Sequence, residues 1–162
     1  MKTKKHGGVE AHAFVAFGQH VTADTIVLRG LLDGVGNMNN AIVFFDFGTG
    51  WIACEPVHTR SEEDTLTAFH RFIGPGKKVE SFYSDNAPEL VAVAETKLGW
   101  TSDTSTPGMP RDNSIAESKV KLVINGARSL LLQAGLPSKY WPYATQAFCN
   151  GLNFTILGDR SR

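Results

Sequence analysis

Three acidic residues stand where the neighbouring sequence predicts a strand or the start of a helix. Asp24 lies inside the run VTADTIV, Asp85 follows the run SFYS, and Glu117 falls in the first turn of a long predicted helix. A buried carboxylate is strongly penalised unless it is paired or binds a cation. Carboxylate oxygens suit Mg²⁺ or Mn²⁺, which complete their shell with water and substrate phosphate. If the three side chains converge at the carboxyl ends of sheet strands, they predict a metal site for phosphoryl transfer.

Each of these acids also has a purely structural explanation. Asp85 could initiate the helix that begins near Ala87, with the Asp-Asn pair forming a turn. Glu117 could be a first-turn acid favoured by the helix dipole, or the partner of Lys121 four positions later. Asp24, taken alone, could likewise have only a structural role. The metal site is therefore a hypothesis about the three residues together.

The first half of the chain predicts strands followed by a helix. Short β-branched or aromatic runs are separated by segments rich in Gly and Asn, and they predict three strands joined as hairpins, over residues 20–28, 40–47 and 51–57. A helix is expected from the N-cap Ser61 to Gly74, because acids fill its first turn and apolar residues share one face. Asp46 precedes the sequence FGTG and is expected to cap the second hairpin turn rather than bind a metal.

The second half predicts two more strands and three more helices. The pattern indicates a strand over 78–84, a helix over 88–98 with Asn86 as a possible cap, and a short strand over 100–105. Residues 106–114 contain two prolines and a glycine and are expected to be loop. A long helix should run from Ile115 to Gly135, and a last helix should cover 138–153. Its run YWPYATQAF carries more aromatic surface than a solvated helix tolerates, which predicts packing on the domain or on a second copy.

Composition limits the classes of function. The chain has 162 residues with 16 basic and 16 acidic side chains, so its formal charge of zero lacks the basic excess that would hold nucleic acid by charge alone. Its two cysteines are far apart and show no zinc-binding spacing, which fits a reducing compartment. No apolar run is long enough to span a membrane. We therefore expect an intracellular protein without membrane contact, made of a tail over 1–13, one domain over 14–158 and a stub over 159–162.

Five segments of the chain resemble the catalytic core of retroviral-type integrases, most closely those of Copia-type (Pseudoviridae) long-terminal-repeat retrotransposons. They read TADTI, VFFDFGTGWIACEPVHTRS, FYSDNAPEL, TPGMPRDNSIAESK and ARSLLLQAGLPSKYWPYATQAFCNGLN, and the resemblance extends over about residues 18–157. It implies an α/β ribonuclease H-like fold with a mixed five-stranded sheet flanked by helices. The chain departs from the family pattern at Ser114, where glycine is usual, and at Ser118, where a basic residue is common.

The same resemblance implies an activity and a set of site residues. Asp24, Asp85 and Glu117 match the catalytic carboxylates that hold two Mg²⁺ or Mn²⁺ ions, although the 32 positions between Asp85 and Glu117 are slightly fewer than the family leads us to expect. The implied function is DNA integration by 3′-end processing and strand transfer, with retrotransposon ends and target DNA as partners, a homo-oligomeric state and a nuclear location.

Four further residues are candidates for contact with DNA. Asn113 ends the Pro- and Gly-containing loop that would flank the scissile phosphate, and the long helix carries Lys119, Lys121 and Arg128. A solvated helix face would explain the three basic residues nearly as well.

Two alternatives to an active integrase remain open. A retrotransposon-derived relic could fold and bind DNA weakly without catalysing any reaction. Alternatively, the run FFDFGTGW is similar to the phosphate-binding hairpin of the actin, sugar-kinase and Hsp70 ATPase superfamily, in which Asp46 would hold phosphate and metal. The chain is under half the length expected for that superfamily and has no second glycine-rich phosphate loop.

Overall fold

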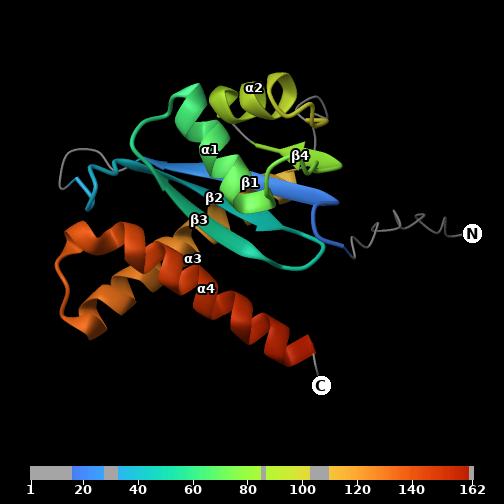
Figure 1. Ribbon diagram of the computed structural model, residues 1–162. Helices are drawn as coiled ribbons and strands as arrows, with labels where there is room; N and C mark the ends of the chain where they lie inside the picture. Colours follow the sequence, from blue (N-terminus) through green and yellow to red (C-terminus); the bar gives the residue numbers. More distant parts are fainter. Residues whose placement is uncertain (1–15, 28–32, 85–86, 103–109, 161–162) are drawn as a thin grey trace, which may run out of the picture.

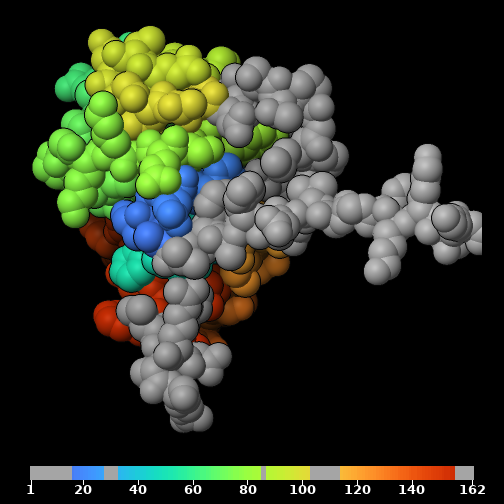
Figure 2. Space-filling view, turned by 90° about the vertical axis from the view of Figure 1, so that its right-hand side faces the viewer, coloured from blue at the N-terminus to red at the C-terminus, as the bar shows by residue number. Residues whose placement is uncertain are grey.

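A computed structural model describes residues 16–27, 33–84, 87–102 and 110–160, with 110–113 and 156–160 described by their backbone alone. A four-stranded sheet in the order β3-β2-β1-β4 forms the middle layer. Helices α1 and α2 cover one face of this sheet, and α3 and α4 cover the other (Figure 1). The side view in Figure 2 shows the same layers, with α2 at the top, the beginning of β1 in the middle and the last two helices below.

The sheet is mixed, as the ribonuclease H-like prediction requires. β1 (His20–Val27), β2 (Asn40–Asp46) and β3 (Ile52–Val57) form an antiparallel meander, which confirms the three predicted hairpin strands. β4 (Ser81–Tyr83) pairs with β1 in parallel and is shorter than the predicted strand over 78–84.

The first two helices begin and end close to the capping signals of the sequence. α1 (Glu62–Ile73) begins after Ser61, whose side chain accepts a hydrogen bond from the Asp64 amide, and it ends at Gly74 as predicted. α2 (Pro88–Thr96) starts with proline in its first turn. Its N-cap residue is Ala87 and makes no side-chain cap, while the alternative cap Asn86 lies outside the described residues.

The second pair of helices, α3 and α4, contact each other and pack on the same core. α3 (Pro110–Ala134) is followed by Gly135 with a φ of 64°, so the predicted stop is confirmed. A short 3₁₀ helix, η1 (Ser138–Tyr140), leads into α4 (Trp141–Arg160). None of the described helices has both the length and the apolar character needed to cross a membrane.

Two predictions about the segment after α2 are wrong. The sheet has four strands rather than five, because within the described residues the predicted strand over 100–105 makes only one parallel bridge, between Ser102 and Phe82. The long helix begins at Pro110 rather than Ile115, so residues 110–114 of the expected loop belong to the helix. Proline is well tolerated in a first helical turn because its missing N–H has no intrahelical partner there.

Aromatic side chains fill the face of the sheet under α1 and α2. Phe44 of β2 stacks on Phe72 with ring centroids 4.6 Å apart, and Phe69 lies edge-on to Phe44 at 5.1 Å. Phe69 also contacts Phe82 of β4 and Trp100. This cluster therefore joins α1, two strands and the segment after α2 in one core.

The face under α3 and α4 is packed with smaller groups. Val123 of α3 and Cys149 of α4 contact apolar side chains of β1, β2 and β3 there. Trp141 also packs against this cluster, which confirms that the last helix places aromatic surface on the domain. Tyr143 of the same helix is 59% exposed.

Asn153 attaches α4 to the edge of the sheet. Its side-chain amide donates to the Ile52 carbonyl at 2.8 Å, and its oxygen accepts from the Ile52 N–H at 2.9 Å. The pair of bonds satisfies backbone groups of β3 that have no further strand beside them.

Candidate active site

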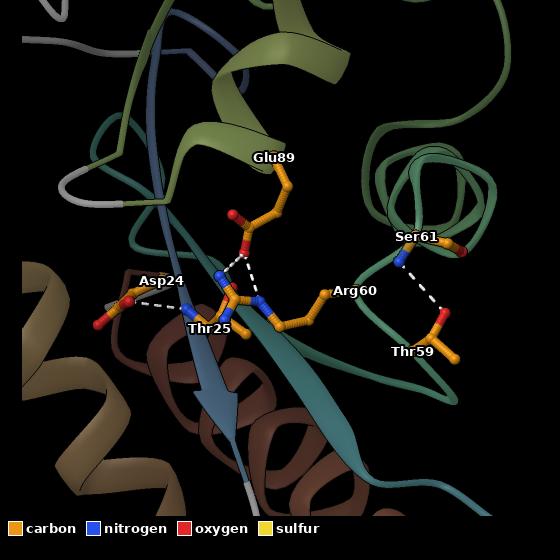
Figure 3. Close-up of polar contacts among 6 residues, drawn as sticks. All are labelled: Asp24, Thr25, Thr59, Arg60, Ser61 and Glu89. Carbon is orange, nitrogen blue, oxygen red and sulfur yellow. Dashed lines mark hydrogen bonds and ion pairs between the residues drawn. The ribbon is translucent and has the colours of Figure 1, made fainter.

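Asp24 lies on the sheet face that α3 covers. Side chains alternate along a strand, and Ile26, two positions later, belongs to the core under α3 and α4. The Asp24 carboxylate is half-buried, and its Oδ1 accepts a hydrogen bond from the Thr25 amide at 2.7 Å. In Figure 3 it points toward the side on which α3 passes and away from Arg60 and Glu89. The sequence prediction of a carboxylate in a strand interior is confirmed for this residue.

Glu117 lies on α3 beside the residues that pack on the sheet. Ala116 is buried and Val120 packs in the core under α3 and α4, whereas Glu117 is exposed. One residue advances a helix by about 100°, so Glu117 lies on the rim of the buried face. α3 contacts both β1 and β2, which places Glu117 and Asp24 on the same side of the sheet.

The third predicted carboxylate, Asp85, lies outside the described residues. Among the residues that are described, no three acidic, His or Cys side chains are grouped as a metal site would require. The donor chemistry nevertheless fits a hard cation, because Asp24 and Glu117 both offer carboxylate oxygens. The described part of the chain thus contains two of the three predicted ligands.

The predicted DNA-binding residues separate into two groups on α3. Lys121 and Arg128 are exposed, and their spacing of four and eleven positions from Glu117 places all three along one side of the helix. Lys119 points to the other side, where its Nζ lies 4.2 Å from the centre of the Phe45 ring. Burial lowers the pKa of Lys119 from its ordinary value. The side chain of Asn113 lies outside the described part, although its backbone belongs to α3.

Asp46 has a structural role in the second hairpin. It is completely buried, and its oxygens accept hydrogen bonds from the Gly18 amide at 2.8 Å and from the Thr49 amide and hydroxyl at 2.7 and 2.6 Å. These contacts confirm the predicted turn cap. Both carboxylate oxygens are engaged inside the fold, which speaks against the phosphate-binding hairpin.

Sequence reasoning missed an ion pair close to Asp24. Arg60, in the connection between β3 and α1, donates from Nε to Glu89 Oε1 at 2.6 Å and also from Nη2 to the same oxygen. The two residues are 29 positions apart, and no local pattern links them. Figure 3 shows this pair above Thr25, the residue that follows Asp24.

The chain is similar to the Pol polyproteins of plant retrotransposons. It is 30% identical over 113 residues to the retrovirus-related Pol polyprotein from transposon RE1 of Arabidopsis thaliana. It is 28% identical over 115 residues to that from RE2 of the same plant, and 29% identical over 82 residues to that from TNT 1-94 of Nicotiana tabacum. The alignments cover 67%, 68% and 48% of this chain but only 8%, 8% and 6% of those proteins. No protein-family model matches the chain.

Two solved structures that resemble the fold are integrase cores. The catalytic core domain of HTLV-2 integrase, in complex with magnesium in a trimeric form, superposes with a TM-score of 0.58 at 15% identity, over 82% of this chain and 83% of that one. The BIV integrase core gives 0.55 at 13% identity, over 82% and 79%. The chain is a Pol polyprotein homologue with an integrase core fold. These relatives fit the resemblance to Copia-type integrase cores. Asp24 and Glu117 lie on β1 and α3, which belong to the part of the chain that has this fold.

Proposed function

We propose that this integrase core is a metal-dependent polynucleotidyl transferase, which processes the 3′ ends of a long-terminal-repeat retrotransposon and joins them to target DNA. The observation that carries the proposal is the placement of two carboxylates on one side of the sheet. Asp24 lies on β1, and Glu117 lies on the helix that packs across β1.

The pairing of β1 with β4 supports a role for Asp85 in the same site. The two strands are parallel, and paired residues differ by 61 positions, as His20 and Ser81 do. Asp24 and Asp85 differ by the same 61 positions. Their separation in the sequence is therefore the one that the described ladder uses, which is the relation expected of two ligands supplied by a pair of parallel strands.

The residues of the chain would divide the work of a phosphoryl transfer. Asp24, Asp85 and Glu117 would hold two divalent ions, Mg²⁺ or Mn²⁺. When bound, such ions activate a water or a DNA 3′-hydroxyl and stabilise the leaving oxygen. Lys121 and Arg128 lie on the Glu117 side of α3, where they would bind backbone phosphates of the DNA. With a net charge of zero and only these few phosphate contacts, DNA binding would be weak and best measured at low salt.

The partners and the location follow from the same proposal. The substrates would be retrotransposon ends and target DNA, so the protein would act in the nucleus. The joining of two ends to one target favours a homo-oligomer, since each core holds one carboxylate set.

The test is a strand-nicking and joining assay on a DNA end at low salt, with Mn²⁺ or Mg²⁺. The native chain should act only with the divalent ion, and Glu117→Gln should lower the rate at least about a hundredfold, because it removes a charged ligand. Mn²⁺ should also raise the melting temperature of the native chain, since a ligand that binds only the folded state stabilises it.

A native chain that gains stability from Mn²⁺ but shows no strand chemistry would support the inactive relic instead. The assay should then be repeated with the flanking integrase domains present. Absence of both the metal effect and the chemistry would refute the proposed function.

A further inference from the structure

The first half of β1 and the neighbouring strand β4 carry polar side chains on the face of the sheet where Asp24 lies. Side chains alternate along a strand, so His20 and Thr22 share a face with Asp24. In the parallel ladder these two residues pair with Ser81 and Tyr83 of β4, the edge strand beside β1 (Figure 1). His20 Nδ1 and Ser81 Oγ lie 3.0 Å apart, so the paired side chains do meet on one side. We call His20, Thr22, Ser81 and Tyr83 the polar strip.

The polar strip differs from the residues around it. On the opposite face, the alternate residues Val21, Ala23 and Phe82 are buried in the core under α1 and α2. On the same face, Ile26 and Val43 are buried in the core under α3 and α4. A strand face that only packs on other elements carries apolar side chains. Core packing therefore does not explain the residue types of the strip.

The hydroxyl of Thr22 points to a ligand or water in this part of the face. Thr22 is 1% exposed, and its Oγ1 has no hydrogen-bond partner in the described part of the chain. A buried hydroxyl without a partner is unfavourable, because its hydrogen bonds to water have been lost. Buried polar groups are normally satisfied, so another molecule is expected to complete this one. Thr22 is two positions from Asp24, which places that molecule beside the candidate site.

Tyr83 is the residue of the strip that a large ligand can reach together with Asp24. His20 and Thr22 are buried, whereas Tyr83 is half-buried and lies on the edge strand. Tyr83 pairs with Thr22, so Asp24 is its diagonal neighbour on the same face. Strands lie about 4.8 Å apart and each residue advances about 3.3 Å, which gives roughly 8 Å between the two Cα atoms. Their side chains are therefore close enough to contact one ligand.

The proposed substrate calls for contacts that do not depend on positive charge. The formal charge of the chain is zero, and Asp24 and Glu117 place two carboxylates on this side of the sheet. An aromatic ring stacks on a nucleotide base without any charge, and every base offers a face for it. A terminal base pair has only one stacking neighbour, so its bases unpair at lower cost than those inside a duplex. A half-buried tyrosine beside the candidate site suits such a base.

We infer that Tyr83 is a substrate-contact residue, whose ring stacks on an unpaired terminal base of the DNA and so holds the neighbouring phosphate beside Asp24. The inference rests on the proposed function, because it takes DNA as the ligand and Asp24 as part of the site. The Thr22 hydroxyl, next to Tyr83 in the ladder, completes the subsite as a hydrogen-bonding group. Neither residue is a metal ligand in this scheme.

Four variants of the full chain separate stacking from the other roles of a tyrosine. Tyr83→Leu removes the ring, and Tyr83→Phe keeps the ring while it removes the hydroxyl. Tyr143→Leu is the matched control, because Tyr143 is a 59% exposed tyrosine on α4. Lys121→Met removes an expected phosphate contact from α3 and shows what the loss of a charge does. Thermal unfolding of each variant checks that it is folded.

The measurement is DNA affinity by fluorescence anisotropy, from low to moderate salt and in EDTA so that no strand is cut. A duplex with an unpaired end is compared with a fully paired duplex of the same length. Tyr83→Leu should weaken binding of the unpaired end about tenfold or more, with an unchanged salt dependence, because an uncharged ring releases no counterion. Tyr83→Phe and Tyr143→Leu should bind as the native chain does. Lys121→Met should weaken binding of both duplexes and lower the salt slope by about 1.

A fluorescent adenine analogue as the unpaired base gives a second readout, which does not require the leucine variant. Its emission should be quenched when the native chain or Tyr83→Phe binds, because a stacked base is quenched. Unchanged emission with bound native chain would overturn the inference. Native affinity in Tyr83→Leu would also overturn it, as would equal losses in Tyr83→Phe or Tyr143→Leu.

Failure of the proposed function gives a different result. A native chain that quenches the unpaired base through Tyr83 but never cuts DNA with Mn²⁺ retains the subsite and refutes the enzyme. A native chain that cuts DNA, with the same rate and affinity in Tyr83→Leu, retains the enzyme and refutes the subsite. A native chain that binds neither duplex at low salt refutes both.

Discussion

The buried core under α1 and α2 is rich in large aromatic rings, whereas the buried core under α3 and α4 consists of aliphatic side chains and cysteines and lies on the side of Asp24. On the first face, Phe44, Phe69 and Phe82 are fully buried, and the ring of Phe69 contacts the other two. On the second face, Val123 and Cys149 belong to the buried core, and Asp24 is half-buried. Large buried rings dominate core energetics, so we expect the aromatic face to supply more of the stability than the face on which Asp24 carries an unfavourable carboxylate. The difference suggests that stability and chemistry are assigned to opposite faces.

The largest expected effect separates two aspartates on paired strands. Asp24→Asn should lower metal-dependent strand nicking about a thousandfold or more, because it removes a ligand charge, and should leave the fold intact. Asp46→Asn should instead lower the free energy of unfolding by about 2 to 3 kcal/mol, because an amide NH₂ would then face a buried donor. Nicking assays and denaturant unfolding of both variants test the contrast. An Asp46→Asn variant that loses activity but keeps its stability would contradict the expected difference between the two aspartates.

A second prediction compares the two cores by truncation. Phe69→Ala should cost about 3 to 5 kcal/mol, since it removes a ring that contacts three other aromatic side chains. Val123→Ala should cost about 2 kcal/mol because it deletes only two methyl groups from the other core. Urea unfolding with comparison of both midpoint and slope provides the measurement. Equal losses in the free energy of unfolding would show that the two cores contribute equally to stability.

The third prediction concerns the contact between α3 and α4. A side chain at Gly126 would overlap the ring of Phe148, so Gly126→Ala should destabilise the protein by about 1 to 3 kcal/mol. Gly151 of α4 has open space around it, and Gly151→Ala should stabilise by up to about 1 kcal/mol through helix propensity. Opposite signs in thermal unfolding would support close packing here. A neutral Gly126→Ala would mean that α3 and α4 can move apart at little cost.

Elements with local signals were predictable from the sequence. β-Branched and aromatic runs between Gly- and Asn-rich segments predicted the three hairpin strands, and Ser61 and Gly135 marked helix ends, because caps and turns depend on neighbouring residues. The position of Asp24 in a strand followed from the same run. The acid in its apolar run was the signal for the site.

Features that depend on distant residues were not predictable in this way. Within the described residues, the segment predicted as a strand over 100–105 contributes one bridge, between Ser102 and Phe82. Asn153 binds Ile52 across 101 positions, and Arg60 binds Glu89 across 29. Such contacts are decided by the tertiary fold, and a polar residue on a helix gives no indication of which distant backbone it will meet.

The smallest expected effect concerns a carboxylate at the outer edge of the sheet. Glu55 of β3 is half-buried, and burial raises its pKa although Arg71 opposes the shift. The folded state therefore binds more protons than the unfolded state between the ordinary pKa of about 4.5 and the raised value, so Glu55 lowers stability as pH rises through this window.

Glu55→Gln should flatten that decline, and the variant should be at least as stable as the native chain at pH 7. Melting temperatures from pH 4 to 8 provide the test, with the exposed Glu62→Gln as the control. A variant that is less stable at pH 7 would show that the Arg71 interaction outweighs desolvation, and that this edge is held by charge rather than by apolar packing.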